Sequence, residues 1–214
     1  MENIEIRNEN KSDYTEVELL TREAFWNLYT MGCDEHYLVH IMRKSPDFIK
    51  ELAFVATIGD KIIGNIMFTK SYVINKNDSS RIETLTFGPI SVLPEFQRKG
   101  LGTKLINYSK KIALEMGYGA IIILGHPHNY CKHGFKVSKD FNISDSSGKY
   151  PFGLLVFELQ PGYLNKVEGS FYTSPIYDFK SDEADEFDKQ FEKKIKEFRP
   201  SQYEFQIACR AIVE

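Results

Sequence analysis

Apolar and polar positions repeat with two different periods along the chain, which predicts a mixture of strands and helices. Residues 3–7 alternate at every second position, whereas apolar side chains from Val17 to Leu28 recur at helical spacing. Strands are expected over residues 3–7, 52–58, 61–74, 82–93 and 120–124, near Val137, and over residues 152–159. Helices are expected from Ser12 or Asp13 to Leu28, from Asp34 to just before Pro46, and from near Gly100 to Gly117. The pattern predicts an α/β, or mixed α+β, fold.

Short signals indicate how these elements connect. Gly59-Asp60 between two apolar runs predicts a hairpin, because such turns need residues that tolerate positive φ. The run from Ala120 to Leu124 is continuously apolar, as expected for a strand covered on both faces. Gly88-Pro89 interrupts the strand over residues 82–93 and predicts a bulge or an edge there.

The segment from residue 161 to 214 is expected to be an extension of a domain formed by residues 1–160. Ser181 precedes an acidic stretch that suits a helix start. Phe187, Phe191, Ile195 and Phe198 then recur at helical spacing up to Pro200. We therefore expect a helix near residues 182–198, packed on the same domain or on a dimer partner.

Composition and charge narrow the class of protein. Of 214 residues, 42% are hydrophobic, enough for a sizeable core. The 27 basic and 30 acidic side chains give a net charge of −3, which supports neither a nucleic-acid partner nor binding to an anionic membrane. Three widely spaced cysteines show no disulfide framework, and the charged amino terminus is no signal peptide. A cytoplasmic protein is the expectation.

The most informative stretch lies between the strand ending near Leu93 and the helix starting near Gly100. Gly100 and Gly102 would let backbone N–H groups at a helix start approach an anion closely, and a pyrophosphate is the natural occupant. The P-loop spacing of nucleotide hydrolases is absent. The dinucleotide fingerprint also fails, because Leu105 stands where its third glycine is required.

Three sequence pieces, in order, resemble the GCN5-related N-acetyltransferase (GNAT) superfamily. Gln97-Arg98-Lys99-Gly100-Leu101-Gly102 resembles its Q/R-x-x-G-x-G/A signature, and residues 90–96 resemble the approach to that signature. Tyr130-Cys131-Lys132-His133-Gly134-Phe135 resembles its Y-x-x-x-G-F element. The resemblance covers roughly residues 3–160. It implies a central mixed, mostly antiparallel sheet flanked by helices, here with a C-terminal helical extension.

The resemblance also implies acetyl-coenzyme A as cosubstrate. No metal is expected, because no carboxylate or cysteine accompanies His126 and His128 at regular ligand spacing. The pantetheine arm of acetyl-coenzyme A would pair with the backbone of Ile90, Ser91 and Val92. The Gly88-Pro89 break would help to separate this strand from its neighbour, and Asn129 would contact the cosubstrate. The pyrophosphate would lie on the signature residues, which are Gln97, Arg98, Lys99, Gly100, Leu101, Gly102 and Thr103.

The acid and the base of the reaction differ in how well the sequence indicates them. Tyr130 occupies the family position of the tyrosine that protonates the leaving thiolate. Counting back from Gln97 puts Thr86 where one branch of the family has a glutamate base, and a threonine is no base. Glu83 is a weak alternative base. His126 and His128 are weaker ones, and deprotonation through water stays open.

The acceptor side would lie between the first two helices and the last strands. Its candidates are Trp26, Tyr29, Asp34, Glu35 and residues 150–152, whose aromatic rings and carboxylates suit a cationic amine. The resulting hypothesis is transfer of an acetyl group to a primary amine of a small molecule or peptide, by direct attack in a ternary complex. A non-catalytic acetyl-CoA-binding sensor or regulatory module is the alternative. A homodimer is possible, because the aromatic tail needs a surface to cover.

Overall fold

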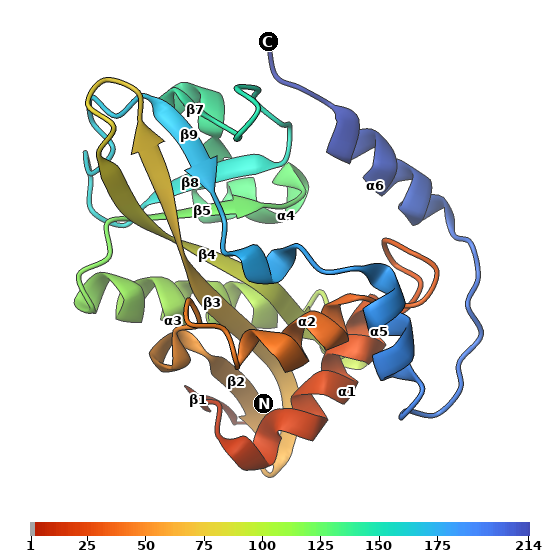
Figure 1. Ribbon diagram of the computed structural model, residues 1–214. Helices are drawn as coiled ribbons and strands as arrows, with labels where there is room; N and C mark the ends of the chain where they lie inside the picture. The colour runs from red at the N-terminus through yellow and green to blue at the C-terminus, as the bar shows by residue number, and fades with distance from the viewer. Residues whose placement is uncertain (1–2) are drawn as a thin grey trace.

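A twisted sheet of nine strands forms the centre of the molecule, and the computed structural model describes residues 3–214 (Figure 1). The strands are β1 (Ile4–Asn8), β2 (Phe54–Ile58), β3 (Lys61–Asn75), β4 (Arg81–Val92), β5 (Ala120–Leu124), β6 (Lys136–Val137), β7 (Ile143–Ser144), β8 (Leu154–Glu158) and β9 (Gly169–Tyr172). The helices are α1 (Tyr14–Phe25), α2 (Glu35–Met42), α3 (Leu101–Glu115), α4 (Pro127–Tyr130), α5 (Ser181–Asp188) and α6 (Pro200–Arg210). Six short 3-10 helices connect them: η1 (Lys11–Asp13), η2 (Lys50–Leu52), η3 (Pro94–Phe96), η4 (Cys131–His133), η5 (Ser138–Phe141) and η6 (Pro175–Tyr177).

The sheet is mixed and mostly antiparallel, which confirms the predicted fold class. The main path runs β1-β2-β3-β4-β5-β8-β6, and β9 pairs with both β3 and β7. The β4–β5 and β7–β9 pairs are parallel, and the remaining pairs are antiparallel. The parallel step from β4 to β5 needs a crossover, and α3 supplies it.

The two central strands β4 and β5 separate along their length. Within the described residues, Leu85 and Ile121 form the one register pair between them. The Thr86 hydroxyl adds a 2.8 Å hydrogen bond to the Ile122 carbonyl. Beyond this point β4 continues to Val92 paired with β3 alone, so a gap opens between β4 and the end of β5.

Helices cover both faces of the sheet with apolar stripes. The stripe of α3 buries Leu105, Ile106 and Ala113 in one core cluster, together with residues of β2 to β5 and β8. On the other face, Val17 of α1 and Val39 of α2 belong to a second buried cluster. The sheet is therefore fixed between α3 and the α1–α2 pair, and the geometry at the ends of β4 and β5 rests on a packed core.

The helix expected near residues 182–198 is wrong for most of its length. Helix α5 ends at Asp188, and residues 189–199 are not helical. A carbonyl that a longer helix would use is bound by a side chain instead, because Arg22 of α1 donates to Glu192 at 2.9 Å. Trp26, directly after α1, donates to the Ile195 carbonyl at 3.0 Å. The apolar stripe expected from Phe187 to Phe198 is also not buried as one face, because Ile195 is 82% exposed.

Pro200 begins a helix, where the sequence analysis expected a stop. A proline is well tolerated in the first helical turn because its missing N–H has no partner there. Helix α6 follows, at the right of Figure 1. Gln202 fixes it to the body, since its buried amide donates to the Asn27 carbonyl at 3.1 Å.

Residues after 160 also contribute to the sheet itself. Strand β9 pairs with the outer half of β3, with Tyr172 opposite Tyr72. After it, Tyr177 of η6 reaches the centre of the molecule, where its hydroxyl donates to the Gly88 carbonyl at 3.3 Å. None of the helices described for residues 3–214 has the length and apolar character required to cross a membrane.

Candidate functional site

The gap between β4 and β5 is part of a cavity of about 630 Å³. This volume lies within the range of small-molecule sites. Residues 86–90 of β4 form one wall, and residues 124–126 after β5 form another. The cavity extends from the start of α3 at Gly100 to α1 and α2 at Phe25 and Glu35. It can therefore hold one elongated ligand against the sheet and a second, smaller one beside α1 and α2.

The start of α3 is open to an anion. Gly100 has φ +83°, and an added Cβ at Gly100 or Gly102 would meet no atom within 4 Å. No side chain caps the first turn, so the N–H groups of Leu101 and Thr103 have no partner inside the helix. Arg98 lines the same end of the cavity, and Lys99 is exposed beside it. The arrangement fits a pyrophosphate bound by main-chain amides and a nearby cation.

Most of the predicted signature residues lie together at this end. Those lining the cavity are Gln97, Arg98, Gly100, Leu101, Gly102 and Thr103. Lys99 does not line it, and its ammonium group lies 5.6 Å from the centre of the Phe96 ring. Gln97 donates to the Val92 carbonyl at 3.0 Å, which holds the loop against the end of β4.

Successive side chains of the strand leading to this loop face the cavity and the opposite, buried face in turn. Ile90 and Val92 line the cavity. Ser91 is buried on the opposite face, where its hydroxyl donates to Thr21 of α1 at 3.1 Å. Because Ser91 pairs with Asn65 of β3, this part of β4 is already hydrogen-bonded on one edge. The edge that faces β5 is the one available to an extended ligand.

Tyr130 ends α4 on the cavity wall. Its ring lies over Gly125, where an added Cβ would come within 2.4 Å of it, and packs against Phe87 with the two centroids 5.7 Å apart. Burial raises the pKa of Tyr130 above its ordinary range, and Tyr29 adds to the effect. The phenol therefore keeps its proton at neutral pH and can donate it.

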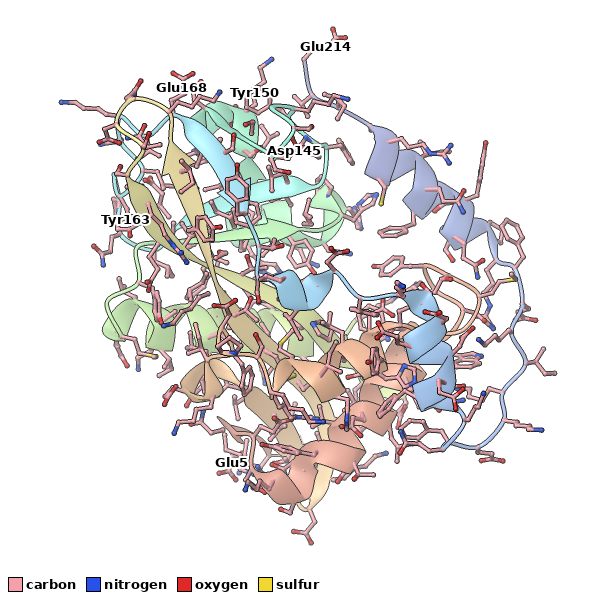
Figure 2. The ribbon with its side chains drawn as sticks, in the orientation of Figure 1. Glu5, Asp145, Tyr150, Tyr163, Glu168 and Glu214 are labelled. Carbon is pink, nitrogen blue, oxygen red and sulfur yellow. The ribbon has the colours of Figure 1, made fainter. Side chains whose placement is uncertain are left out.

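The candidate bases differ in whether they line the cavity. Glu83 is exposed and does not line the cavity, and its carbonyl accepts a 2.9 Å hydrogen bond from Tyr163. Figure 2 shows Tyr163 on the side of the molecule away from α6. His126 lines the cavity, whereas the exposed His128 does not. Asn129, also exposed, lines it beside Tyr130.

Of the acceptor-side candidates, the structure brings Tyr29 and Glu35 to the cavity. Burial raises the pKa of Glu35 to about 7, so its carboxyl group titrates near neutral pH. Trp26 instead donates to the Ile195 carbonyl, and Asp34 accepts a hydrogen bond from Ser181 at 2.8 Å. Tyr150 and Phe152 do not line the cavity, although the Phe152 ring lies 6.0 Å from that of His126.

Three cavity residues from the C-terminal segment, Thr173, Tyr177 and Phe205, were not expected from the sequence. Phe205 of α6 stacks on Tyr29 with centroids 4.5 Å apart and an interplanar angle of 30°. Tyr177 of η6 lines the cavity near Gly88, and burial raises its pKa to about 12. Pro200-Ser201 was the available signal for α6, because proline followed by serine suits a helix start.

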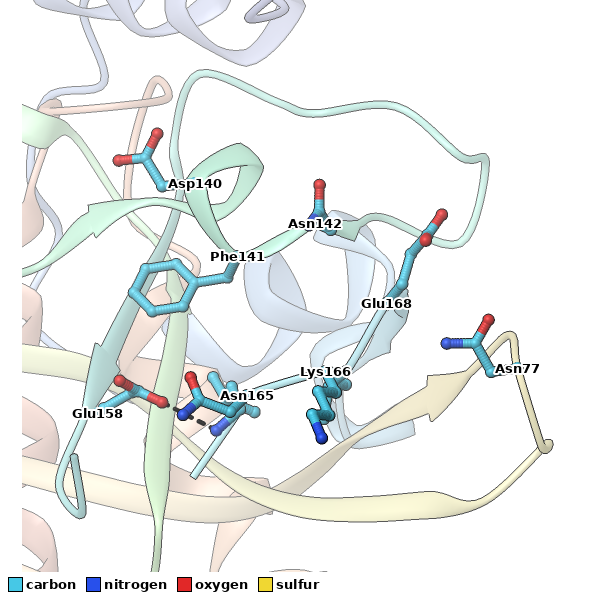
Figure 3. Close-up of a pocket in the computed structure, with 10 residues that line it drawn as sticks. Asn77, Asp140, Phe141, Asn142, Glu158, Asn165, Lys166 and Glu168 are labelled. Atoms are coloured by element: carbon cyan, nitrogen blue, oxygen red, sulfur yellow. Dashed lines mark hydrogen bonds between the residues drawn. The ribbon is translucent and has the colours of Figure 1, made fainter. Parts of the chain in front are cut away.

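A second depression, of about 480 Å³, lies at the far end of the sheet (Figure 3). Glu158 lies on its wall and accepts hydrogen bonds from the N–H groups of Gly162 and Leu164. It contains none of the predicted site residues. Among residues 3–214, no three His, Cys, Asp or Glu side chains gather as a metal site would require.

Comparisons with known proteins place this geometry in a family. The model of the Acetyltransferase (GNAT) family matches residues 7–135, more than half of the chain. A curated relative, the uncharacterized N-acetyltransferase YjhQ of Escherichia coli (strain K12), is 28% identical over 127 residues. That match covers 59% of this chain and 66% of YjhQ, just under two thirds of its length.

Two solved structures share the fold. One is the GNAT family N-acetyltransferase YhbS from Escherichia coli in complex with CoA, with a TM-score of 0.73 and 22% identity over 84% of this chain and 94% of that one. The other is a GNAT family acetyltransferase from Brucella melitensis in complex with acetyl-CoA, with a TM-score of 0.65 and 21% identity over 83% and 99%. The family match, the sheet and the open start of α3 agree: the chain belongs to the Acetyltransferase (GNAT) family.

Proposed function

We propose that this protein transfers the acetyl group of acetyl-CoA to a primary amine, by direct attack of the amine in a ternary complex. The observation that carries the proposal is the single cavity joining the open start of α3 to Tyr130 and Glu35. Anion-binding amides, a protonated phenol and a titrating carboxyl group line one space. These are the groups that acetyl transfer to an amine requires.

The residues at the start of α3 fit the pyrophosphate of acetyl-CoA. The N–H groups after Gly100 point along the helix axis toward its N-terminus, where the helix dipole favours negative charge. Arg98 adds a positive charge at the same end, and the absence of side chains at Gly100 and Gly102 leaves room for two phosphates. Acetyl-CoA bound here supplies the thioester that the amine attacks.

The splayed strand provides the position for the pantetheine arm. An extended ligand along residues 90–92 would add to β4 as a further strand, with main-chain hydrogen bonds in place of the missing β5 partners. A main-chain N–H of this stretch can also stabilise the negative charge that develops on the carbonyl oxygen. Tyr130 then donates its proton to the sulfur as the carbon–sulfur bond breaks.

The test is release of CoA thiol from acetyl-CoA in the presence of an amine panel. The panel contains arylalkylamines, polyamines, amino acids and peptides with free amino termini. We expect amine-dependent thiol release, together with saturable acetyl-CoA binding by calorimetry. Tight acetyl-CoA binding without turnover of any amine would support a sensor or regulatory module instead. Absence of acetyl-CoA binding would contradict both.

A further inference from the structure

The charges on the cavity wall are segregated along its length. Of the described residues that line it, Glu35 alone carries a carboxylate. The permanently charged basic side chains on the wall are Arg98, in the loop before α3, and Lys132 of η4; His126 and His133 also line it, and burial lowers the pKa of His133. A ligand that bridges the cavity would therefore meet positive charge at one end and a single negative charge at the other.

The end that contains Glu35 is lined mainly by rings and aliphatic groups. Phe25 at the end of α1 and Tyr29 in the loop that follows lie 5.9 Å apart between centroids, and Phe205 of α6 stacks on Tyr29. Tyr177 reaches the cavity from η6, and Leu28 and Leu38 complete this part of the wall. Such a surface suits an apolar or aromatic body and can also stabilise a cation against the ring faces.

Glu35 is held in place at the start of α2. Its Oε2 accepts hydrogen bonds from the Asp34 N–H at 3.3 Å and from the Cys33 thiol at 3.4 Å. Burial raises the pKa of Tyr29, and the charge of Glu35 adds to the effect; burial also raises the pKa of Tyr130, with a smaller contribution from Tyr29. These three groups therefore lie within electrostatic range of one another, in the order Glu35, Tyr29 and Tyr130.

We infer that this end of the cavity binds a small amine with one positive charge and an apolar or aromatic body, and that Glu35 holds its ammonium group and accepts its proton. The inference rests on the proposed acetyl transfer and names the acceptor class for it. A second positive charge on the acceptor would have no further carboxylate to pair with among the described residues that line the cavity. A carboxylate beside the amine would be repelled by Glu35.

Glu35, Tyr130 and the amine account for every proton that moves. The amine enters as an ammonium ion and loses one proton to Glu35, which passes it to water. The nitrogen lone pair then forms the bond to the acetyl carbon, and the carbon–sulfur bond breaks. The nitrogen loses a second proton, which replaces the one that Tyr130 donates to sulfur. The products are the amide, CoA thiol and one released proton.

The experiment compares three probes of this end of the cavity at saturating acetyl-CoA. 2-Phenylethylamine has one positive charge and a ring, phenylalanine adds a carboxylate, and spermidine carries several charges without a ring. We expect kcat/KM for 2-phenylethylamine to exceed the other two at least about tenfold, since a buried unpaired charge is costly. Glu35→Gln should lower it about 100-fold, the range of general base catalysis.

Two matched variants separate the site from general effects on stability. Phe205→Ala should raise KM for 2-phenylethylamine several-fold, whereas Tyr203→Ala, on the same helix but 58% exposed, should not. Glu23→Gln removes an exposed carboxylate of α1 and should leave kcat/KM unchanged. A KM increase in Phe205→Ala with kcat kept would show an effect on acceptor binding.

Three outcomes would overturn the inference while the proposed function stands. They are a preference for spermidine or phenylalanine, a Glu35→Gln variant with wild-type kcat/KM, and turnover of other amines but none of 2-phenylethylamine. Failure of the proposed function looks different, because then no amine of any class would release thiol or acetyl-CoA would not bind.

Discussion

The hydroxyl of Thr86 donates a 2.8 Å hydrogen bond to the carbonyl of Ile122, at the point where β4 and β5 separate. Thr86 stands where one branch of the family has a glutamate base, and here its side chain joins two strands instead. The carboxyl group that lines the cavity is that of Glu35, from α2. The proposed acid and base are therefore distributed between the sheet end and the helices that face it.

Gly100→Asp should weaken acetyl-CoA binding at least tenfold. The substitution forces a side chain into a left-handed position with φ +83° and adds negative charge beside the pyrophosphate site. Calorimetry measures the effect. Gly148→Asp is the matched control, because Gly148 has φ +81° and an equally open Cβ position but does not line the cavity. Equal affinities in the two variants would contradict the anion site.

Tyr130→Phe should lower kcat by about 100-fold with little change in acetyl-CoA affinity, because it removes the proton donor but keeps the ring. The raised pKa of Tyr130 means that its proton is present throughout the neutral range. Steady-state thiol release and calorimetry provide the two numbers. Tyr108→Phe, which removes the hydroxyl of an exposed tyrosine on α3, should change neither. A wild-type kcat in Tyr130→Phe across pH would exclude the phenol from proton transfer.

Asp188→Ala should destabilise the fold by about 3–5 kcal/mol, because it leaves the buried guanidinium of Arg22 without its carboxylate. Arg22 is 2% exposed, and its Nε lies 2.6 Å from Asp188 Oδ1. Chemical denaturation measures the loss. Glu23→Gln breaks an exposed pair with Lys194 and should cost less than about 1 kcal/mol. Similar losses in both variants would show that the buried pair contributes no more than the exposed one.

The N-terminal three quarters of the fold could be predicted because their signals are local. Strand and helix periods, the Gly59-Asp60 turn and the Gly117 helix stop all act within a few residues. The start of α3 was predictable for the same reason. The residues that shape it follow one another in the chain, and the positive φ of Gly100 is a property of that residue alone.

The C-terminal segment could not be predicted because distant contacts decide its conformation. The Glu192 carbonyl accepts a hydrogen bond from the Arg22 side chain, whereas a helix over residues 182–198 would have paired it with the N–H of Lys196. The Ile195 carbonyl accepts another from Trp26. Phe205 reaches the cavity because α6 packs against the loop after α1, where Phe205 stacks on Tyr29. Glu35 was among the acceptor-side candidates, but the sequence offered no reason to prefer it to Asp34, its neighbour.

The stability of Glu35→Gln should depend on pH differently from that of the wild type. The folded state raises the pKa of Glu35 from 4.5 to about 7, so between these values the folded protein binds more protons than the unfolded chain. Wild-type unfolding free energy therefore falls as pH rises through this window, relative to the variant, which has no carboxyl group to titrate. Above pH ~7 the difference should be constant.

Denaturation of both proteins from pH 4 to 8 tests this expectation. His36, whose pKa burial lowers to about 4, titrates in both proteins and cancels in the difference. The groups that act on Glu35 also remain in both, namely Cys33 and Asp34 beside it, as does Tyr29, on whose pKa the charge of Glu35 acts. Parallel curves at all pH values would show that Glu35 keeps its ordinary pKa in the folded protein.

A crystal structure of the protein with CoA would show whether the gap between β4 and β5 is the cosubstrate site. We predict the pyrophosphate on the main-chain amides that follow Arg98, the pantetheine arm along residues 90–92 of β4, and the sulfur near the Tyr130 hydroxyl. CoA seated outside the gap between β4 and β5, or a side chain filling the space beside Gly100 and Gly102, would contradict this prediction.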